Sequence, residues 1–210
     1  KAVKHPVSAE LVKRLSDRFE FYCKAASEVK TPALSVPLLR PEGKVGFDHE
    51  IWNGAAKIDD FKKAYTQGKV PSVHRSEALL FHDSKNLYMN LKFYDPGMKK
   101  LNCKTPPPGK KNDFIPESDH VEIFLCDPAN PGTYYLFSID PHNVSSELKG
   151  MDSSWNGPWE HEVRTFDDRW EVLVKIPLST IHADGAGGNL LRGTILREYH
   201  KHGTDGNSKR

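Results

Sequence analysis

The sequence predicts a mainly β fold, an antiparallel sandwich of jelly-roll type with a helix at its N-terminal end. Three observations predict this fold. Apolar and polar residues alternate with a period of two in several short stretches after residue 47. Clusters of Pro, Gly, Asn and Asp separate these stretches, as turns separate the strands of a sandwich. Residues 8–29, in contrast, carry apolar side chains at spacings of three and four, the period of an amphipathic helix.

Residues 1–43 are expected to form a helix followed by a proline-rich linker. Ser8 can act as the N-cap of the helix over 8–29. Pro and Gly residues in 30–46 indicate a linker or a loose edge strand. The helix is then either the tail of an upstream domain or an element that packs on the sandwich of residues 44–210. Its apolar stripe consists of Leu11, Leu15, Phe19, Tyr22, Cys23 and Ala26.

The sandwich is centred on a predicted hairpin over 118–140. Alternate residues on each arm are apolar, so one face of the hairpin is expected to be buried. The other face carries Glu122, Ser138 and Asp140 among apolar neighbours. A carboxylate in such surroundings either faces water or meets a ligand, because burying it without a partner is costly. The other strands are expected at 77–81, 86–95, 159–165, 169–176 and 193–200, with Trp52 and Trp170 in the core and Glu171 and Lys175 turned outward.

Composition argues against several classes of function. Lys and Arg number 30 against 28 Asp and Glu, a balance that argues against nucleic-acid binding and against a polybasic membrane role. No apolar run approaches the roughly 20 residues needed to span a bilayer. The chain opens at Lys1 without Met, so we expect that its start has been cut away. Among three cysteines, Cys103 and Cys126 either form a bridge or remain reduced.

The sequence contains no H-E-x-x-H zinc motif, no G-x-S-x-G motif and no Gly-rich phosphate loop. Glu122 and Asp140 have the chemistry of a glycosidase acid pair, but two acids on a sheet are more often a polar binding face or a cation site. We therefore expect that the chain is not an enzyme. Calcium prefers several carboxylate and carbonyl oxygens, and Asp48, Asp127 and Asp140 near turns are candidate ligands. The alternative is that these aspartates simply form turns.

Aromatic residues in polar loops are candidate sugar platforms. Trp155 and Trp159 lie among Asp, Ser and Asn in the loop over 152–159. The apolar face of a pyranose can stack on such a ring while its hydroxyls meet polar partners. The alternative is that both rings fold back as a lid on the core. Phe114 is a further candidate platform in the long loop over 96–117, and loops of this length are usually functional or disordered.

Four motifs occur in a characteristic order at 48–53, 86–95, 118–124 and 169–177. They are an Asp–Trp turn, an L-Y strand ending in Asp, the run Ser-Asp-His-Val-Glu-Ile-Phe, and a strand with Trp-Glu that ends in Ile-Pro. With these motifs the chain from about residue 44 to its end resembles the family 9 carbohydrate-binding modules and the wider DOMON-like group of sandwiches. The resemblance does not cover residues 1–43.

This resemblance implies a non-catalytic sandwich that binds sugars and often holds structural calcium. Glu122 matches the signature acid that hydrogen-bonds sugar hydroxyls, and Asp140 matches a polar contact on the next strand. Ser138 stands where a sugar-binding member has Arg, and Pro116 stands where that member has one of two stacking Trp residues. The last strand ends near Arg197, a further candidate ligand contact. The family normally adds another strand after this point, so we expect the chain to be truncated there.

The leading hypothesis is a carbohydrate-binding module that serves a glycoside-degrading enzyme and is extracellular or periplasmic. Its partners would be a carbohydrate ligand and an attached catalytic domain. Two alternatives remain open. In one, the sandwich binds no sugar and packs against a neighbouring catalytic domain. In the other it is a DOMON-like haem or redox domain, which needs axial ligands, and His120 and Met89 are the candidates.

Overall fold

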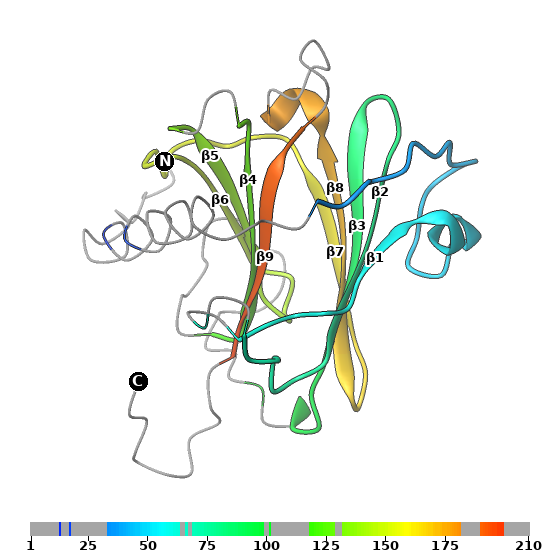
Figure 1. Ribbon diagram of the computed structural model, residues 1–210, viewed down its shortest axis with the longest axis vertical. Helices are drawn as coiled ribbons and strands as arrows, with labels where there is room; N and C mark the ends of the chain where they lie inside the picture. Colours follow the sequence, from blue (N-terminus) through cyan, green and yellow to red (C-terminus); the bar gives the residue numbers. More distant parts are fainter. Residues whose placement is uncertain are drawn as a thin grey trace, which may run out of the picture.

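The computed structural model describes residues 13, 17, 33–63, 66, 69–98, 101, 118–128, 132–181 and 190–199. These residues form two sheets that pack face to face (Figure 1). The five-stranded sheet has the order β1-β2-β3-β8-β7, and the four-stranded sheet has the order β6-β5-β4-β9. All strand pairings in both sheets are antiparallel. The predicted mainly β, antiparallel sandwich is therefore confirmed.

The chain crosses between the sheets after β3, after β6 and after β8. Strands that follow one another closely, such as β2 and β3, pair as hairpins, while β9 returns to lie beside β4. The five-stranded sheet contains β1 (Ala56–Ile58), β2 (Ser76–His82), β3 (Asn86–Tyr94), β7 (Glu160–Thr165) and β8 (Arg169–Pro177). The four-stranded sheet contains β4 (His120–Cys126), β5 (Tyr134–Ile139), β6 (Ser145–Lys149) and β9 (Arg192–Glu198). Two short 3-10 helices, η1 (Glu50–Gly54) and η3 (Leu178–Ile181), complete the described elements.

The main core lies between the two sheets and is built from alternate residues of the strands. β3 and β8 pair over their whole length, and Trp170 of β8 is fully buried beside Phe93 of β3, with ring centroids 4.6 Å apart. From the other sheet, Val121, Ile123 and Phe137 face the same core. The apolar alternation seen in the sequence therefore fills this interior, because successive side chains of a strand point to opposite faces.

A second apolar cluster covers part of the outer face of the five-stranded sheet. Trp52 of η1 packs against Phe81 of β2 at a centroid distance of 5.0 Å, and Phe81 stacks on Tyr88 of β3 at 4.5 Å. The Trp52 indole N–H donates to the carbonyl of Gly46 at 2.8 Å. The predicted core position of Trp52 is confirmed, although it belongs to this outer cluster and not to the space between the sheets.

The segment before η1 lies along the edge of the five-stranded sheet. The Leu39 amide donates to the carbonyl of His82, and the His82 amide donates to the carbonyl of Pro37. The predicted helix over 8–29 lies outside the described residues except for Lys13 and Asp17, which are both helical. No helix among the described residues is long and apolar enough to cross a membrane.

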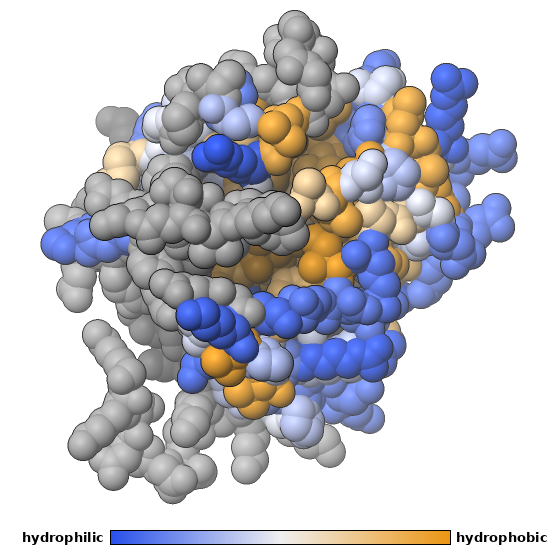
Figure 2. All heavy atoms as spheres, in the orientation of Figure 1, coloured by the Kyte–Doolittle hydropathy of each residue, from blue (hydrophilic) through white to orange (hydrophobic). Residues whose placement is uncertain are grey.

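Hydrophilic side chains cover much of the described surface in the view of Figure 2, while hydrophobic ones gather towards its centre. Cys126 of β4 is buried and its sulfur is a thiol. Of the two alternatives, a bridge to Cys103 or a reduced cysteine, the structure therefore shows the reduced one at Cys126. Cys103 itself lies outside the described residues.

Candidate functional site

The candidate site named from the sequence is the outer face of the β4–β5 hairpin. Glu122 of β4 lies directly opposite Ser138 of β5, and Phe124 lies opposite Leu136. Since alternate residues share a face, these side chains point away from the core that Val121 and Ile123 enter. We call this surface the outer β4–β5 face; it consists of His120, Glu122, Phe124, Cys126, Tyr134, Leu136, Ser138 and Asp140.

The outer β4–β5 face has a polar end and an apolar end. Glu122, Ser138 and Asp140 lie at the polar end, near His120. The apolar end is one cluster of four side chains, Phe124, Cys126, Tyr134 and Leu136, with Leu148 of β6 packed against it. Burial raises the pKa of the Tyr134 phenol above its ordinary value. Carboxylate and hydroxyl groups beside aromatic rings are the chemistry that a sugar requires, because a sugar presents hydroxyls and an apolar ring face.

Neither carboxylate of this face is presented to solvent, contrary to the expectation from the sequence. Glu122 is 2% exposed and Asp140 is fully buried. His120 Nε2 lies 3.4 Å from Glu122 Oε1. Because His120 Nδ1 contacts the Ser118 carbonyl at 2.6 Å, and a carbonyl only accepts, Nδ1 carries a proton. If Nε2 also carried a proton, the contact between His120 and Glu122 would be an ion pair.

Asp140 has a structural role in the turn between β5 and β6. Its Oδ1 accepts from the backbone amides of His142 and Val144, both at 2.9 Å. This is the local bonding by which Asp replaces a backbone turn bond. Asn143 within the turn has a φ of 63°, a left-handed conformation that Asn tolerates. Asp140 therefore forms this turn in the described structure, and its sugar contact stays a prediction.

Trp155 and Trp159 fold back on the core, which was the alternative prediction. The Trp155 ring lies 5.3 Å from that of Tyr135, and the Trp159 ring lies 5.0 Å from that of Phe137. Trp159 Nε1 donates to Glu147 Oε2 at 3.3 Å. Tyr135 and Phe137 face the interior, so the two Trp rings lie on the opposite side of β5 from Glu122.

Arg197 of β9 also points inward. Its register partner is Val121, which faces the core. The guanidinium donates to the Tyr94 carbonyl at 2.8 Å and to Asp95 Oδ2 at 3.0 Å, and so it joins the four-stranded sheet to the end of β3. Burial lowers the pKa of Arg197 despite this partner. The predicted ligand role of Arg197 is not supported, because its side chain is engaged between the sheets.

The candidate calcium ligands do not come together. Asp48 precedes η1 and is held by Arg164 of β7, while Asp127 follows β4 in the other sheet. No group of three or more metal-ligating side chains occurs among the described residues. Phe114 lies outside the described residues. The haem alternative requires axial ligands that face one pocket. His120 lies on the outer β4–β5 face and Met89 lies in the core, so the two side chains do not face the same pocket.

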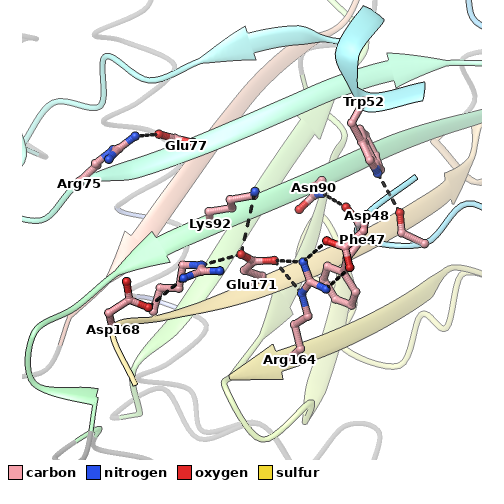
Figure 3. Close-up of polar contacts among 12 residues, drawn as sticks. Phe47, Asp48, Trp52, Arg75, Glu77, Asn90, Lys92, Arg164, Asp168 and Glu171 are labelled. Atoms are coloured by element: carbon pink, nitrogen blue, oxygen red, sulfur yellow. Dashed lines mark hydrogen bonds and ion pairs between the residues drawn. The ribbon is translucent and has the colours of Figure 1, made fainter. Parts of the chain in front are cut away.

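A charge network that the sequence did not reveal lies on the outer face of the five-stranded sheet (Figure 3). Glu171 of β8 is at its centre and is fully buried. Arg169 Nε lies 2.7 Å from Glu171 Oε1, and Arg164 Nε lies 2.8 Å from Oε2. Arg164 also binds both oxygens of Asp48, and this hydrogen bonding lowers the pKa of that carboxyl. The sequence predicted that Glu171 turns outward, and it does lie on the outer face of the sheet. It is nevertheless buried, because Arg164 and Arg169 cover it.

A serine–histidine–asparagine chain of hydrogen bonds joins the two sheets at their β6 and β7 edges. His161 Nε2 lies 3.0 Å from Ser145 Oγ, and His161 Nδ1 lies 2.8 Å from Asn143 Oδ1. This connectivity resembles that of an activated nucleophile. Ser145 is fully buried, however, so a substrate cannot reach its hydroxyl. We therefore assign the chain of hydrogen bonds to closing this side of the sandwich.

Comparison with solved structures identifies related folds. A family 9 carbohydrate-binding module from Caldicellulosiruptor kristjanssonii in complex with glucose matches with a TM-score of 0.53 and 17% identity, over 77% of this chain and 75% of that chain. The same kind of module from that organism in complex with cellotriose gives a TM-score of 0.54 and 18% identity, over 78% and 75%. A structure from Bacteroides uniformis matches over 71% of this chain with a TM-score of 0.50 and 15% identity.

No protein-family model and no curated protein sequence matches the chain. The structural likeness therefore establishes the fold: the chain has the sandwich fold of the family 9 carbohydrate-binding modules, as the order of its four motifs predicted.

Proposed function

We propose that this sandwich, which has the fold of the family 9 carbohydrate-binding modules, is a non-catalytic carbohydrate-binding domain. The observation that carries the proposal is the likeness in fold to modules in complex with glucose and with cellotriose. The wider setting is also proposed from the resemblance: an attached glycoside-degrading enzyme and a location outside the cytoplasm.

The outer β4–β5 face is the surface on which we place the ligand. Glu122 supplies a carboxylate that can accept from two sugar hydroxyls, and Ser138 supplies a hydroxyl directly opposite it. Phe124 and Tyr134 lie further along the same strands, with ring centroids 6.1 Å apart. Such rings can support the apolar face of a pyranose. Because Glu122 is 2% exposed, a ligand reaches it only after a local rearrangement at this face.

Calorimetry with glucose, cello-oligosaccharides and a panel of xylan and mannan fragments tests the proposal. Glu122→Gln keeps the shape of the side chain and removes the charge, so we expect at least a tenfold loss of affinity, since a hydrogen bond to a charged group contributes about 1.5–3 kcal/mol. Glu160→Gln is the matched control, because Glu160 lies on the outer edge strand β7 with a side chain that is 70% exposed. Absence of heat with every glycan, or equal affinities for wild type and Glu122→Gln, would contradict the proposal.

The second candidate is a structural sandwich that binds no sugar and packs against a neighbouring domain. The burial of both Glu122 and Asp140 favours it, as does the packing of Trp155 and Trp159 on the core. Under this alternative the calorimetric panel gives no heat with wild type. Glu122→Gln then changes only the free energy of unfolding, which a urea titration measures.

A further inference from the structure

The polar end of the outer β4–β5 face is rich in carboxyl groups. His120 lies directly opposite Glu198 of β9, and Glu122 lies two residues further along β4 on the same face. Asp140 follows the last residue of β5 and lies at the same end of the hairpin. Carboxyl groups from its own strand and from both neighbouring strands therefore flank His120.

Few cationic side chains share this face with them. On the outer side of the four strands β6, β5, β4 and β9, the only Lys or Arg is Arg192, which lies opposite Cys126 at the other end of β4. It is about 20 Å from Glu198 along β9, so the two charges interact weakly. His142, in the turn after β5, is exposed. Within these strands, His120 is thus the side chain at the polar end that can carry a positive charge.

The contacts of the buried His120 ring require protons on both of its nitrogens. Nδ1 lies 2.6 Å from the Ser118 carbonyl, which only accepts, so Nδ1 carries one proton. Nε2 lies 3.4 Å from Glu122 Oε1. A lone pair on Nε2 would face the lone pairs of a buried carboxylate, and neither group would gain a hydrogen bond for the water it lost. A proton between the two atoms removes this conflict, and the flanking carboxyl groups favour its position on the ring, because nearby opposite charges stabilise a cation.

We propose that His120 is a positioning residue, an imidazolium that holds the Glu122 carboxylate in a buried ion pair. The Ser118 carbonyl anchors the ring and thereby directs Nε2 at Glu122 Oε1. Because His120 holds Oε1, it fixes the orientation and the charge of the carboxylate that would accept from a sugar hydroxyl. The ion pair does not depend on a ligand, whereas its effect on sugar affinity rests on the proposed carbohydrate binding.

The ion pair makes the proposed sugar site dependent on pH. An imidazolium that is stabilised by the fold contributes at low pH, and its contribution is lost as the pH rises and Nε2 loses its proton. At sufficiently low pH the Glu122 carboxylate is protonated and loses its charge. The affinity for sugar should therefore be highest at intermediate pH and fall on both sides, and the two limbs belong to the coupled pair.

Long-range proton–nitrogen NMR of the free, full chain tests the ion pair without any sugar. The signals that disappear in His120→Gln identify this ring among the 10 histidines. We expect both ring nitrogens to be protonated at neutral pH, and Nε2 to lose its proton at lower pH in Glu122→Gln than in wild type. His142→Gln is the matched control at an exposed histidine and should leave the His120 signals unchanged. A ring protonated on Nδ1 alone at neutral pH would overturn the proposal, and so would a titration that Glu122→Gln does not shift.

Two substitutions separate the roles of the two ring nitrogens in sugar binding. His120→Gln keeps a donor near the position of Nε2 but cannot ionise, whereas His120→Asn keeps a donor near that of Nδ1. In calorimetry with cellotriose we expect His120→Asn to lose about tenfold in affinity, since it removes a hydrogen bond to a charged group. His120→Gln should retain most of the affinity and lose the decline at high pH. Equal losses for the two variants, or a decline that persists in His120→Gln, would contradict the positioning role.

The two measurements distinguish this proposal from the proposed function. A doubly protonated His120 in a protein that binds no glycan contradicts the carbohydrate function and leaves the ion pair standing. Sugar binding by a protein whose ring is singly protonated contradicts the ion pair and leaves the function standing. Circular dichroism shows whether each variant is folded; if His120→Asn does not fold, the NMR titrations of wild type and Glu122→Gln still decide.

Discussion

The Arg164 guanidinium binds Glu171 and Asp48 at the same time. Its Nε and Nη2 lie 2.8 and 2.7 Å from Glu171 Oε2, and its Nη1 and Nη2 lie 2.6 and 2.7 Å from the two oxygens of Asp48. Asp48 belongs to the segment before η1, whereas Glu171 belongs to β8. Arg164 therefore ties this segment to the five-stranded sheet. The Phe47 ring adds to the tie, because the guanidinium carbon lies 4.4 Å from its centroid.

Replacing Arg164 with Met is expected to lower the free energy of unfolding by about 2–3 kcal/mol. The cost arises because a fully buried Glu171 loses one of its two close guanidinium partners and keeps Arg169. Urea unfolding measures this difference. Lys175→Met is the matched control on the same sheet; its partner Glu160 is exposed, so we expect a loss below about 1 kcal/mol. Equal losses of unfolding free energy for the two variants would show that the burial of Glu171 does not strengthen its ion pair with Arg164.

Tyr88 is expected to ionise at unusually high pH. Burial raises its pKa to about 12, and its hydrogen bond to Asp83 Oδ2, at 3.0 Å, acts in the same direction. Since the folded value lies above the unfolded one near 10, the related stability is complete below about pH 10 and is lost as the pH rises through about 12. The phenolate absorbance of wild type minus that of Tyr88→Phe should therefore titrate near pH 12. Asp83→Asn should lower this midpoint, and a difference titrating near 10 would refute the assignment.

Gly157→Ala is expected to displace Trp155 from the core. A Cβ at residue 157 would overlap the Trp155 ring and would lie 2.8 Å from Thr180 Cγ2. Overpacking of this kind costs about 1–3 kcal/mol, so the midpoint of thermal unfolding should fall and Trp fluorescence should change. Gly46→Ala is the control, because nothing lies within 4 Å of its added Cβ. If Gly157→Ala behaves like Gly46→Ala, the packing of Trp155 against Tyr135 is looser than described.

Replacing Arg197 with Leu is expected to cost about 3–5 kcal/mol of unfolding free energy. Asp95 is 1% exposed and would lose the cation that joins it to β9, leaving an uncompensated buried charge. Arg197→Lys should recover part of the loss, since it restores the charge and not the two-armed geometry. Arg192→Leu serves as the control, because Arg192 lies at the exposed start of the same strand. A near-zero effect of Arg197→Leu would mean that Asp95 gains water when the arginine is removed.

The sequence predicted the faces of the β4–β5 hairpin correctly, and the register confirms that Glu122 and Ser138 share one of them. It also predicted the burial of Trp52 and Trp170. Trp170 takes a core-facing alternate position of β8, whereas Trp52 lies in η1 and packs on the outer face of the five-stranded sheet. The exposure of Glu122 and Asp140 could not be predicted in this way. Period-two alternation gives the side of a strand on which a residue lies, but not what packs above that side.

The prediction of the candidate site also depended on residues in loops, and for these the sequence allowed two interpretations. Trp155 and Trp159 follow no periodic pattern, so only the folded chain decides whether they meet solvent or Phe137. The Glu171 network illustrates the same limit, since Arg164 and Asp48 are far apart in sequence and adjacent in the fold.

The amino-acid sequence by itself determined the antiparallel sandwich and the two sides of each strand, because side-chain direction along a strand is a local property of the backbone. Only the tertiary structure decided which polar side chains are buried and that Arg197 joins the two sheets. Those outcomes depend on contacts between residues distant in the chain, and no local pattern of residues encodes them.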